Sequence, residues 1–177
     1  DSDRIYASGW SNGCAMAQRM AMESSHIFAA VGCMSFYLLM TPINTYSPIP
    51  IMEVHGFLDQ VVLYESSVLS VPTNPESWTD PEAVQTGAIE NLYEWADLNG
   101  CTGLTPDYND QQPLYSIQGF SNCVNNSQVR LMTIFGAQHN PYAKDYPGEG
   151  LGILLPGTQG LVQSSYIVWD FLSQFSK

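Results

Sequence analysis

A short turn rich in glycine, set between a strand pattern and a helix pattern, constrains this chain most. Residues 9–13 are Gly-Trp-Ser-Asn-Gly. The segment before them, Arg4 to Ser8, is β-branched and aromatic, and the segment Asn12 to Ser24 is rich in Ala and Met, which favour helices. Glycines on either side let a strand and a helix approach closely, because no Cβ atoms collide there. The sequence therefore predicts a strand that leads directly into a helix through a tight, strained turn centred on Ser11.

The rest of the chain alternates short apolar runs with helical patterns, an order typical of α/β proteins. We expect one domain over residues 1–177, built on a mostly parallel sheet flanked by helices. The expected strands are Arg4 to Ser8, Phe28 to Met34, Ile49 to His55 and Val129 to Phe135. The expected helices are Asn12 to Ser24, a segment that begins at Asp80 and Pro81 and ends near Leu98, and Leu161 to Phe175. The expected loops are Cys101 to Gln112 and Gly136 to Gly160.

Composition supports a packed core and limits the partners. Hydrophobic residues make up 45% of the chain and charged residues only 12%, so there is enough apolar surface to bury. The net charge of −12 comes from 17 acidic residues against 5 basic ones. Such an excess repels phosphate backbones and anionic lipid headgroups, so we expect neither nucleic acid nor a membrane as a partner. No stretch approaches the roughly 20 consecutive apolar residues that span a bilayer.

Ser11 has the setting of a catalytic nucleophile. A serine hydroxyl needs a base at neutral pH, and the base needs an acid to orient it. Of the three histidines, His139 follows the last expected strand, where a hydrolase of this topology delivers its base from a loop. His55 ends a strand just before Gly56 and is expected to pack or to hydrogen-bond locally, and His26 is expected to be a surface cap. We therefore favour His139 as the base.

Asp59 is the favoured acid, because it lies in a turn after the third expected strand, within reach of a histidine ring. Glu53, inside that strand, is the rival, but a carboxylate in mid-strand is expected to lie in the sheet face or to be paired. The order Ser11, Asp59, His139 is that of the serine, acid and histidine in an α/β-hydrolase. The Asn12 N–H, at the start of the helix, is expected to stabilise an oxyanion. The alternatives are a non-catalytic binding or structural protein on this scaffold and a serine peptidase.

Several sequence blocks follow one another along most of the chain: GWSNGCAMAQRMA, FAAVGCMS, PIPIMEVHGFLDQVV, EWADLNGC and RLMTIFGAQHN. They resemble successive blocks of the secreted polyhydroxybutyrate depolymerase and feruloyl esterase-like family of α/β-hydrolases. The resemblance implies cleavage of a carboxylic ester through an acyl-enzyme, with Ser11 as nucleophile, His139 as base and Asp59 as its partner. The ester substrate would be a polymer of the polyhydroxybutyrate type or a feruloyl or other aryl ester, and no metal or organic cofactor is implied.

Two features depart from the family pattern. Cys14 stands where the family commonly has a second glycine, and Asn140, Pro141 and Tyr142 follow the base where the family has an aromatic residue such as Trp. The family also carries several strands and a helix before the nucleophile strand, including a loop that supplies a second oxyanion N–H. We therefore expect residues 1–177 to be the C-terminal portion of a longer or processed protein. Without a neighbour, Arg4 to Ser8 would be an exposed sheet edge, so we expect a further segment or chain to complete the sheet.

The four cysteines allow three pairings. By the family resemblance, Cys101 pairs with Cys123. Cys14 and Cys33 are either paired or two buried free thiols. A zinc site is not expected, because no two cysteines or histidines have close ligand spacing. The even number of cysteines and the glycosylation sequon Asn125 to Ser127 indicate a secreted, extracellular protein.

Aromatic residues flank both the expected nucleophile and the expected base. Trp10 precedes Ser11, and Tyr142 and Tyr146 follow His139. All three are expected to line an aromatic or polyester-binding cleft. For Trp10 the alternative is packing in the core.

Overall fold

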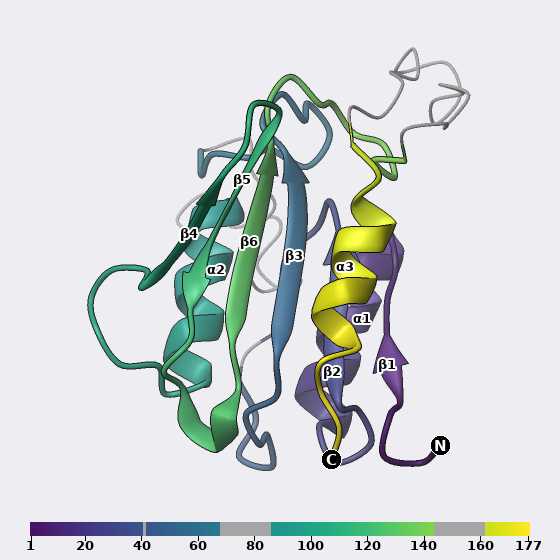
Figure 1. The fold of residues 1–177 in the computed structure, drawn as a ribbon, viewed down its shortest axis with the longest axis vertical. Helices are drawn as coiled ribbons and strands as arrows, with labels where there is room; N and C mark the ends of the chain where they lie inside the picture. Colours follow the sequence, from purple (N-terminus) through teal and green to yellow (C-terminus); the bar gives the residue numbers. More distant parts are fainter. Residues whose placement is uncertain (41, 68–85, 144–161) are drawn as a thin grey trace.

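One mixed sheet organises the described part of the chain (Figure 1). The computed structural model describes residues 1–40, 42–67, 86–143 and 162–177. Within these ranges the sheet has six strands in the order β1-β2-β3-β6-β5-β4. The strands are β1 (Tyr6–Ala7), β2 (Ala30–Met34), β3 (Ile51–Gly56), β4 (Tyr108–Gln111), β5 (Tyr115–Phe120) and β6 (Val129–Ile134). The helices are α1 (Asn12–Ser24), α2 (Ala88–Leu98) and α3 (Ser164–Leu172), with the short 3₁₀ helix η2 (Val124–Asn126).

The sheet has helices on both faces. Strands β1, β2, β3 and β6 run parallel, while β5 and β4 extend the sheet in an antiparallel hairpin. Helices α1 and α2 cover one face and α3 lies on the other (Figure 1). The side chains of β3 alternate accordingly: Ile51 joins the core beneath α1 and α2, whereas Met52 and Val54 join the core beneath α3. The predicted α/β class is confirmed.

The helices agree with the sequence patterns except at the start of α2. Helix α1 has the expected bounds, and α3 lies within the expected Leu161 to Phe175. Helix α2 begins at Ala88 rather than after Asp80, which lies outside the described residues. Gly87 precedes the helix in an extended conformation, with φ −138° and ψ 179°, so the helix cannot continue back through it. Within the described ranges no helix is long and apolar enough to cross a bilayer.

The β4–β5 hairpin corrects the expectation of a loop over Cys101 to Gln112. Strand β4 reads Tyr-Asn-Asp-Gln and lies at the sheet edge with mostly exposed side chains, so it lacks the apolar alternation that identifies a strand. Arg130 of β6 supports the hairpin from within the sheet. Its guanidinium donates to Phe120 O at 2.7 Å and lies 4.2 Å from the centre of the Tyr108 ring.

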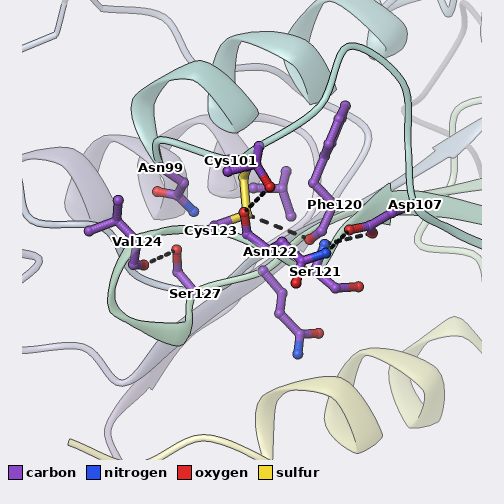
Figure 2. Close-up of a disulfide and its surroundings, with 12 residues drawn as sticks. Asn99, Cys101, Asp107, Phe120, Ser121, Asn122, Cys123, Val124 and Ser127 are labelled. Atoms are coloured by element: carbon purple, nitrogen blue, oxygen red, sulfur yellow. Dashed lines mark hydrogen bonds between the residues drawn. A yellow bond between two sulfur atoms is a disulfide. The ribbon is translucent and has the colours of Figure 1, made fainter.

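The Cys101–Cys123 disulfide predicted from the family resemblance is confirmed (Figure 2). It joins the end of α2 to the turn that precedes η2. Next to it, the Asp107 carboxylate accepts the backbone N–H of Ser121 at 2.8 Å and the side-chain N–H of Asn122 at 2.7 Å. The crosslink and these bonds fasten the polar segment between α2 and β4 to the end of the hairpin.

Cys14 and Cys33 form a second disulfide, which decides between the two alternatives that the sequence left open. This bond joins the first turn of α1 to β2. No free cysteine remains in the chain, since all four lie in the described ranges.

Strand β1 lies at one edge of the described sheet. It consists of Tyr6 and Ala7 and pairs there with β2 alone. The expectations that a further segment or chain completes this edge, and that these residues form the C-terminal portion of a larger fold, stay predictions.

Replacing Cys101 and Cys123 together by serine is expected to lower the free energy of unfolding by about 3 kcal/mol, because the bond closes a loop with a sequence separation of 22. The bonds of Asp107 remain in this variant, so its far-ultraviolet circular dichroism should match that of the wild type. Urea unfolding of both proteins measures the difference. An unchanged denaturation midpoint would contradict the stabilising role of this disulfide.

Stability is expected to depend on pH through Glu94 of α2. Burial raises the pKa of this half-buried carboxyl from 4.5 to about 7. The unfolded chain releases the proton near the ordinary value, so the folded state binds more protons between these two values and loses stability as the pH rises through them. Glu94→Gln cannot ionise. The melting temperature of Glu94→Gln minus that of the wild type should therefore be larger at about pH 8 than at about pH 5.

Thermal unfolding of the wild type and Glu94→Gln at both pH values checks this prediction. Asp97→Asn, on the exposed side of the same helix, is the matched control. A stability difference between Glu94→Gln and the wild type that is the same at both pH values would show that the prediction is wrong.

Candidate active site

Ser11 occupies the strained turn that the sequence predicts between strand and helix. Its φ is 53° and its ψ −126°, a region that residues with a Cβ rarely adopt. Backbone hydrogen bonds hold the turn on both sides. The Ser11 N–H donates to Met34 O at 2.8 Å, and Ser11 O accepts from Cys14 N at 2.7 Å. The strained conformation is therefore fixed by β2 on one side and by α1 on the other.

The two glycines of the motif have different roles. A Cβ atom on Gly9 would lie 2.3 Å from Gly13 O, so any side chain there would push α1 away from the strand. A Cβ atom on Gly13 would meet nothing within 4 Å. The close approach of strand and helix thus requires the first glycine only, which refines the expectation that both are needed.

Ser11, His139 and Asp59 come together from three separate loops. His139 Nε2 lies 2.9 Å from Ser11 Oγ, and His139 Nδ1 lies 2.7 Å from Asp59 Oδ2. A carboxylate can only accept, so Nδ1 carries the proton and the Ser11 hydroxyl donates to Nε2. His139 and Asp59 are buried, while Ser11 is partly exposed. In this geometry a base can take the serine proton while a carboxylate orients the ring.

The Asp59 carboxylate is oriented by its own turn. Its Oδ1 accepts the backbone N–H groups of Val61 and Val62, each at 2.9 Å. Gly56 begins the same turn, and a Cβ atom on it would lie 2.5 Å from Ala137 O. The absence of a side chain at Gly56 therefore lets the loop that carries Asp59 pack directly against the loop that carries His139.

Tyr142 does not line a cleft, contrary to the expectation. It is fully buried, and its hydroxyl is bonded to Ser35 Oγ and, at 2.7 Å, to Gly56 N. Burial raises the pKa of Tyr142, so the hydroxyl stays neutral. Its ring is covered by the core and its polar end has partners at the ends of β2 and β3, so burial is favourable. Tyr142 holds the His139 loop on these strand ends, and Tyr146 lies outside the described residues.

Trp10 lies beside His139. It is half-buried, and its ring centre lies 5.3 Å from that of His139. The indole Nε1 is buried and has no hydrogen-bond partner in the described part of the chain. The position is compatible with both expected roles, packing and contact with a substrate.

The Asn12 N–H is a backbone donor next to Ser11, the predicted nucleophile. Asn12 is the first residue of α1, where N–H groups have no carbonyl one turn earlier to bind. The positive end of the helix dipole adds to its attraction for an anion. As for metals, the described residues contain no group of three or more His, Cys, Asp or Glu side chains that could hold an ion.

A second pair of histidine and carboxylate lies behind Asp59, and sequence reasoning did not assign it to the site. His55 Nδ1 is 2.5 Å from Glu53 Oε1, and His55 Nε2 is 2.8 Å from Val62 O and 3.6 Å from Asp59 Oδ2. The expectations that His55 bonds locally and that a mid-strand Glu53 is paired are confirmed. The sequence signal for this pair is the spacing of Glu53 and His55, two residues apart within a strand, which puts both side chains on one face of the sheet. His26 is exposed, as expected.

The comparison with known proteins points to esterases. No family model matches the chain. The chain is similar to the protein named feruloyl esterase B of Piromyces equi, with 30% identity over 181 residues that cover 99% of this chain and 28% of that protein. The similarity supports an esterase-like family. The chain spans less than a third of this relative's length.

The different roles of the two glycines can be tested directly. Gly9→Ala is expected to lower the free energy of unfolding by about 1–3 kcal/mol, because the new Cβ collides with backbone rather than with a side chain that can move. Gly13→Ala is the matched control and should be neutral or stabilising by up to ~1 kcal/mol, since it adds a better helix former in open space. Thermal unfolding of both variants checks this. Equal stabilities would show that the steric argument fails.

Proposed function

We propose that this chain is the catalytic part of a serine carboxylic ester hydrolase with the α/β-hydrolase fold. The hydrogen-bonded series from Ser11 Oγ through His139 to Asp59, at 2.9 and 2.7 Å, carries the proposal. The three side chains follow strands in the order serine, acid, histidine. Similarity to a protein named feruloyl esterase B favours ester hydrolysis over the other reactions that such a triad performs, peptide cleavage included.

In the proposed reaction Ser11 Oγ attacks the ester carbonyl carbon while His139 Nε2 takes the hydroxyl proton. Asp59 stabilises the imidazolium, and the Asn12 N–H donates to the carbonyl oxygen as it becomes an anion. The bond to the alcohol oxygen then breaks, and His139 gives its proton to that leaving oxygen. Water, deprotonated by His139, attacks the acyl-enzyme, releases the carboxylic acid and restores Ser11.

Feruloyl or other aryl esters are the substrate class that we favour. The name of the relative and the half-buried Trp10 ring beside His139 support an aromatic substrate. The family resemblance of the sequence blocks makes a polyester of the polyhydroxybutyrate type the second candidate. Neutral esters also suit a chain with a net charge of −12, which would repel anionic polymers.

The proposal extends to the setting of the chain. We propose that it is the C-terminal portion of its catalytic domain, and that a segment beside β1 supplies further strands and a second oxyanion donor. Two disulfides persist best in an oxidising compartment, which supports a secreted protein.

The test uses the natural protein that contains this chain. A fluorophosphonate probe should label Ser11 and should not label Ser11→Ala. Hydrolysis of methyl ferulate is expected to fall by roughly 10⁴-fold or more in Ser11→Ala and by about 10⁴-fold in Asp59→Asn, which leaves His139 without an acid to orient it. His26→Ala, an exposed histidine, is the control and should keep full activity.

Each alternative has its own outcome in this experiment. A folded natural protein that takes no label would contradict the proposal and favour a non-catalytic scaffold. Cleavage of peptides without cleavage of esters would favour a peptidase. Turnover of a polyhydroxybutyrate film but not of methyl ferulate would correct the substrate class. Normal ester turnover by His139→Ala would show that the base is wrongly assigned.

A further inference from the structure

The buried pair of Glu53 and His55 takes no part in the proposed proton transfer, yet it adjoins the acid. Both side chains leave the same face of β3, toward α2. Asn91 of α2 donates to Glu53 Oε2 at 2.8 Å, and its own Oδ1 accepts from Leu38 N at 3.0 Å. Glu53, His55 and Asn91 are all buried. The pair is thus fixed in the core by hydrogen bonds on both sides of the carboxylate.

The hydrogen-bond roles determine where the protons of this pair lie. His55 Nε2 faces Val62 O, which can only accept, so Nε2 carries a proton. His55 Nδ1 and Glu53 Oε1 are 2.5 Å apart, so a hydrogen bond between them requires one proton, on one atom or the other. The pair is therefore neutral as a whole, whether that proton lies on nitrogen or on oxygen. In both cases the Nε2–H is present.

The surroundings agree with a single proton in this hydrogen bond. Burial raises the pKa of Glu53. Burial alone would lower the pKa of His55, but the carboxylates of Glu53 and Asp59 raise it overall. Two tyrosine rings also face His55: Tyr37 is stacked on it at 5.3 Å and Tyr64 meets it edge-on at 5.9 Å. Burial raises the pKa of both tyrosines, so neither adds a charge.

His55 acts on the acid turn at two points. Its Nε2–H donates to Val62 O, and Val62 N in turn donates to Asp59 Oδ1 at 2.9 Å. The same Nε2 lies 3.6 Å from Asp59 Oδ2, the oxygen that binds His139 Nδ1. Loss of His55 would release the Val62 carbonyl and would remove a polarised N–H from beside the carboxylate.

We propose that His55, held by Glu53 and Asn91, is a positioning residue that fixes the Asp59 turn and keeps its carboxylate directed at His139. The inference deepens the function proposed above and rests on it, because it concerns the same triad.

The test compares His55→Gln with His55→Asn, two amide side chains that differ only in length. Glutamine places an amide N–H near the position of Nε2 and can still donate to Val62 O, whereas asparagine reaches only the position of Nδ1. In the natural protein that contains this chain, His55→Gln should keep kcat for methyl ferulate within about 3-fold. His55→Asn should lose roughly 10- to 100-fold in kcat with KM nearly unchanged.

Asn99→Ala is the matched control for a loss of buried hydrogen bonds. Asn99 is fully buried, accepts from Tyr46 and donates to Ile49 O before the start of β3, and takes no part in the triad. This variant should be less stable but should keep wild-type kcat. A fall in kcat equal to that of His55→Asn would mean that a general loss of stability, and not positioning, explains the effect.

A second readout does not depend on turnover. The His139 Nδ1–H bonded to Asp59 should give a low-field proton resonance in the wild type and in His55→Gln, and should lose it in His55→Asn. If the wild type shows the resonance but cleaves no ester, the proposed function fails while the resonance still tests the positioning role. Wild-type kcat and resonance in folded His55→Asn, or equal kcat in both His55 variants, would overturn the inference.

If a His55 variant fails to fold, two substitutions of Glu53 provide the same comparison. Glu53→Gln can donate to Nδ1 of a neutral His55 and so preserves the Nε2–H, and it should keep kcat and the resonance. Glu53→Leu leaves the His55 ring without its carboxylate partner, so this variant should lose both kcat and the resonance. Wild-type kcat and resonance in Glu53→Leu, or their loss in Glu53→Gln, would overturn the inference.

Discussion

The parallel pairing of β3 with β6 is the constraint on which the candidate site depends. The two strands are in register over six residue pairs, from Ile51 opposite Val129 to Gly56 opposite Ile134. They point the same way and end together (Figure 1). The loops that carry Asp59 and His139 therefore start side by side, at the carboxyl edge of the sheet. A shift of register by one residue would turn every β3 side chain to the other face and separate Asp59 from His139.

The same pairing forces polar groups into the core. Glu53, His55, Asp59 and His139 are all buried, and isolated charges at such depth are costly. Each is instead bonded: Asp59 to His139 and to two backbone N–H groups, His55 to Glu53 and to a backbone carbonyl, and Glu53 also to Asn91. Removing one member leaves another without a partner, which costs more than the lost bond itself. Stability and the geometry of the site therefore depend on the same bonds.

The parts that the sequence predicted correctly are those with local signals. The glycines around Ser11 and the ends of apolar strands at Asp59 and His139 indicated where these side chains lie, because turn chemistry is local and parallel strands share one carboxyl edge. Strand β4 was missed because an edge strand with polar side chains shows no alternation. The burial of Tyr142 and the contact of His55 with the Asp59 turn were missed because they depend on segments that meet only in three dimensions.

The Cys14–Cys33 disulfide stabilises the turn that carries Ser11, the predicted nucleophile. Cys14 occupies the position where the resembled family commonly has glycine, and its N–H binds Ser11 O. Cys33 directly precedes Met34, whose carbonyl accepts the Ser11 N–H. The disulfide therefore links the two segments that hold the strained turn, one on each side of Ser11. A side chain is tolerated at Cys14 because the close contact of strand and helix occurs at Gly9, and the bond it forms opposes any separation of α1 from β2 that would relax the turn.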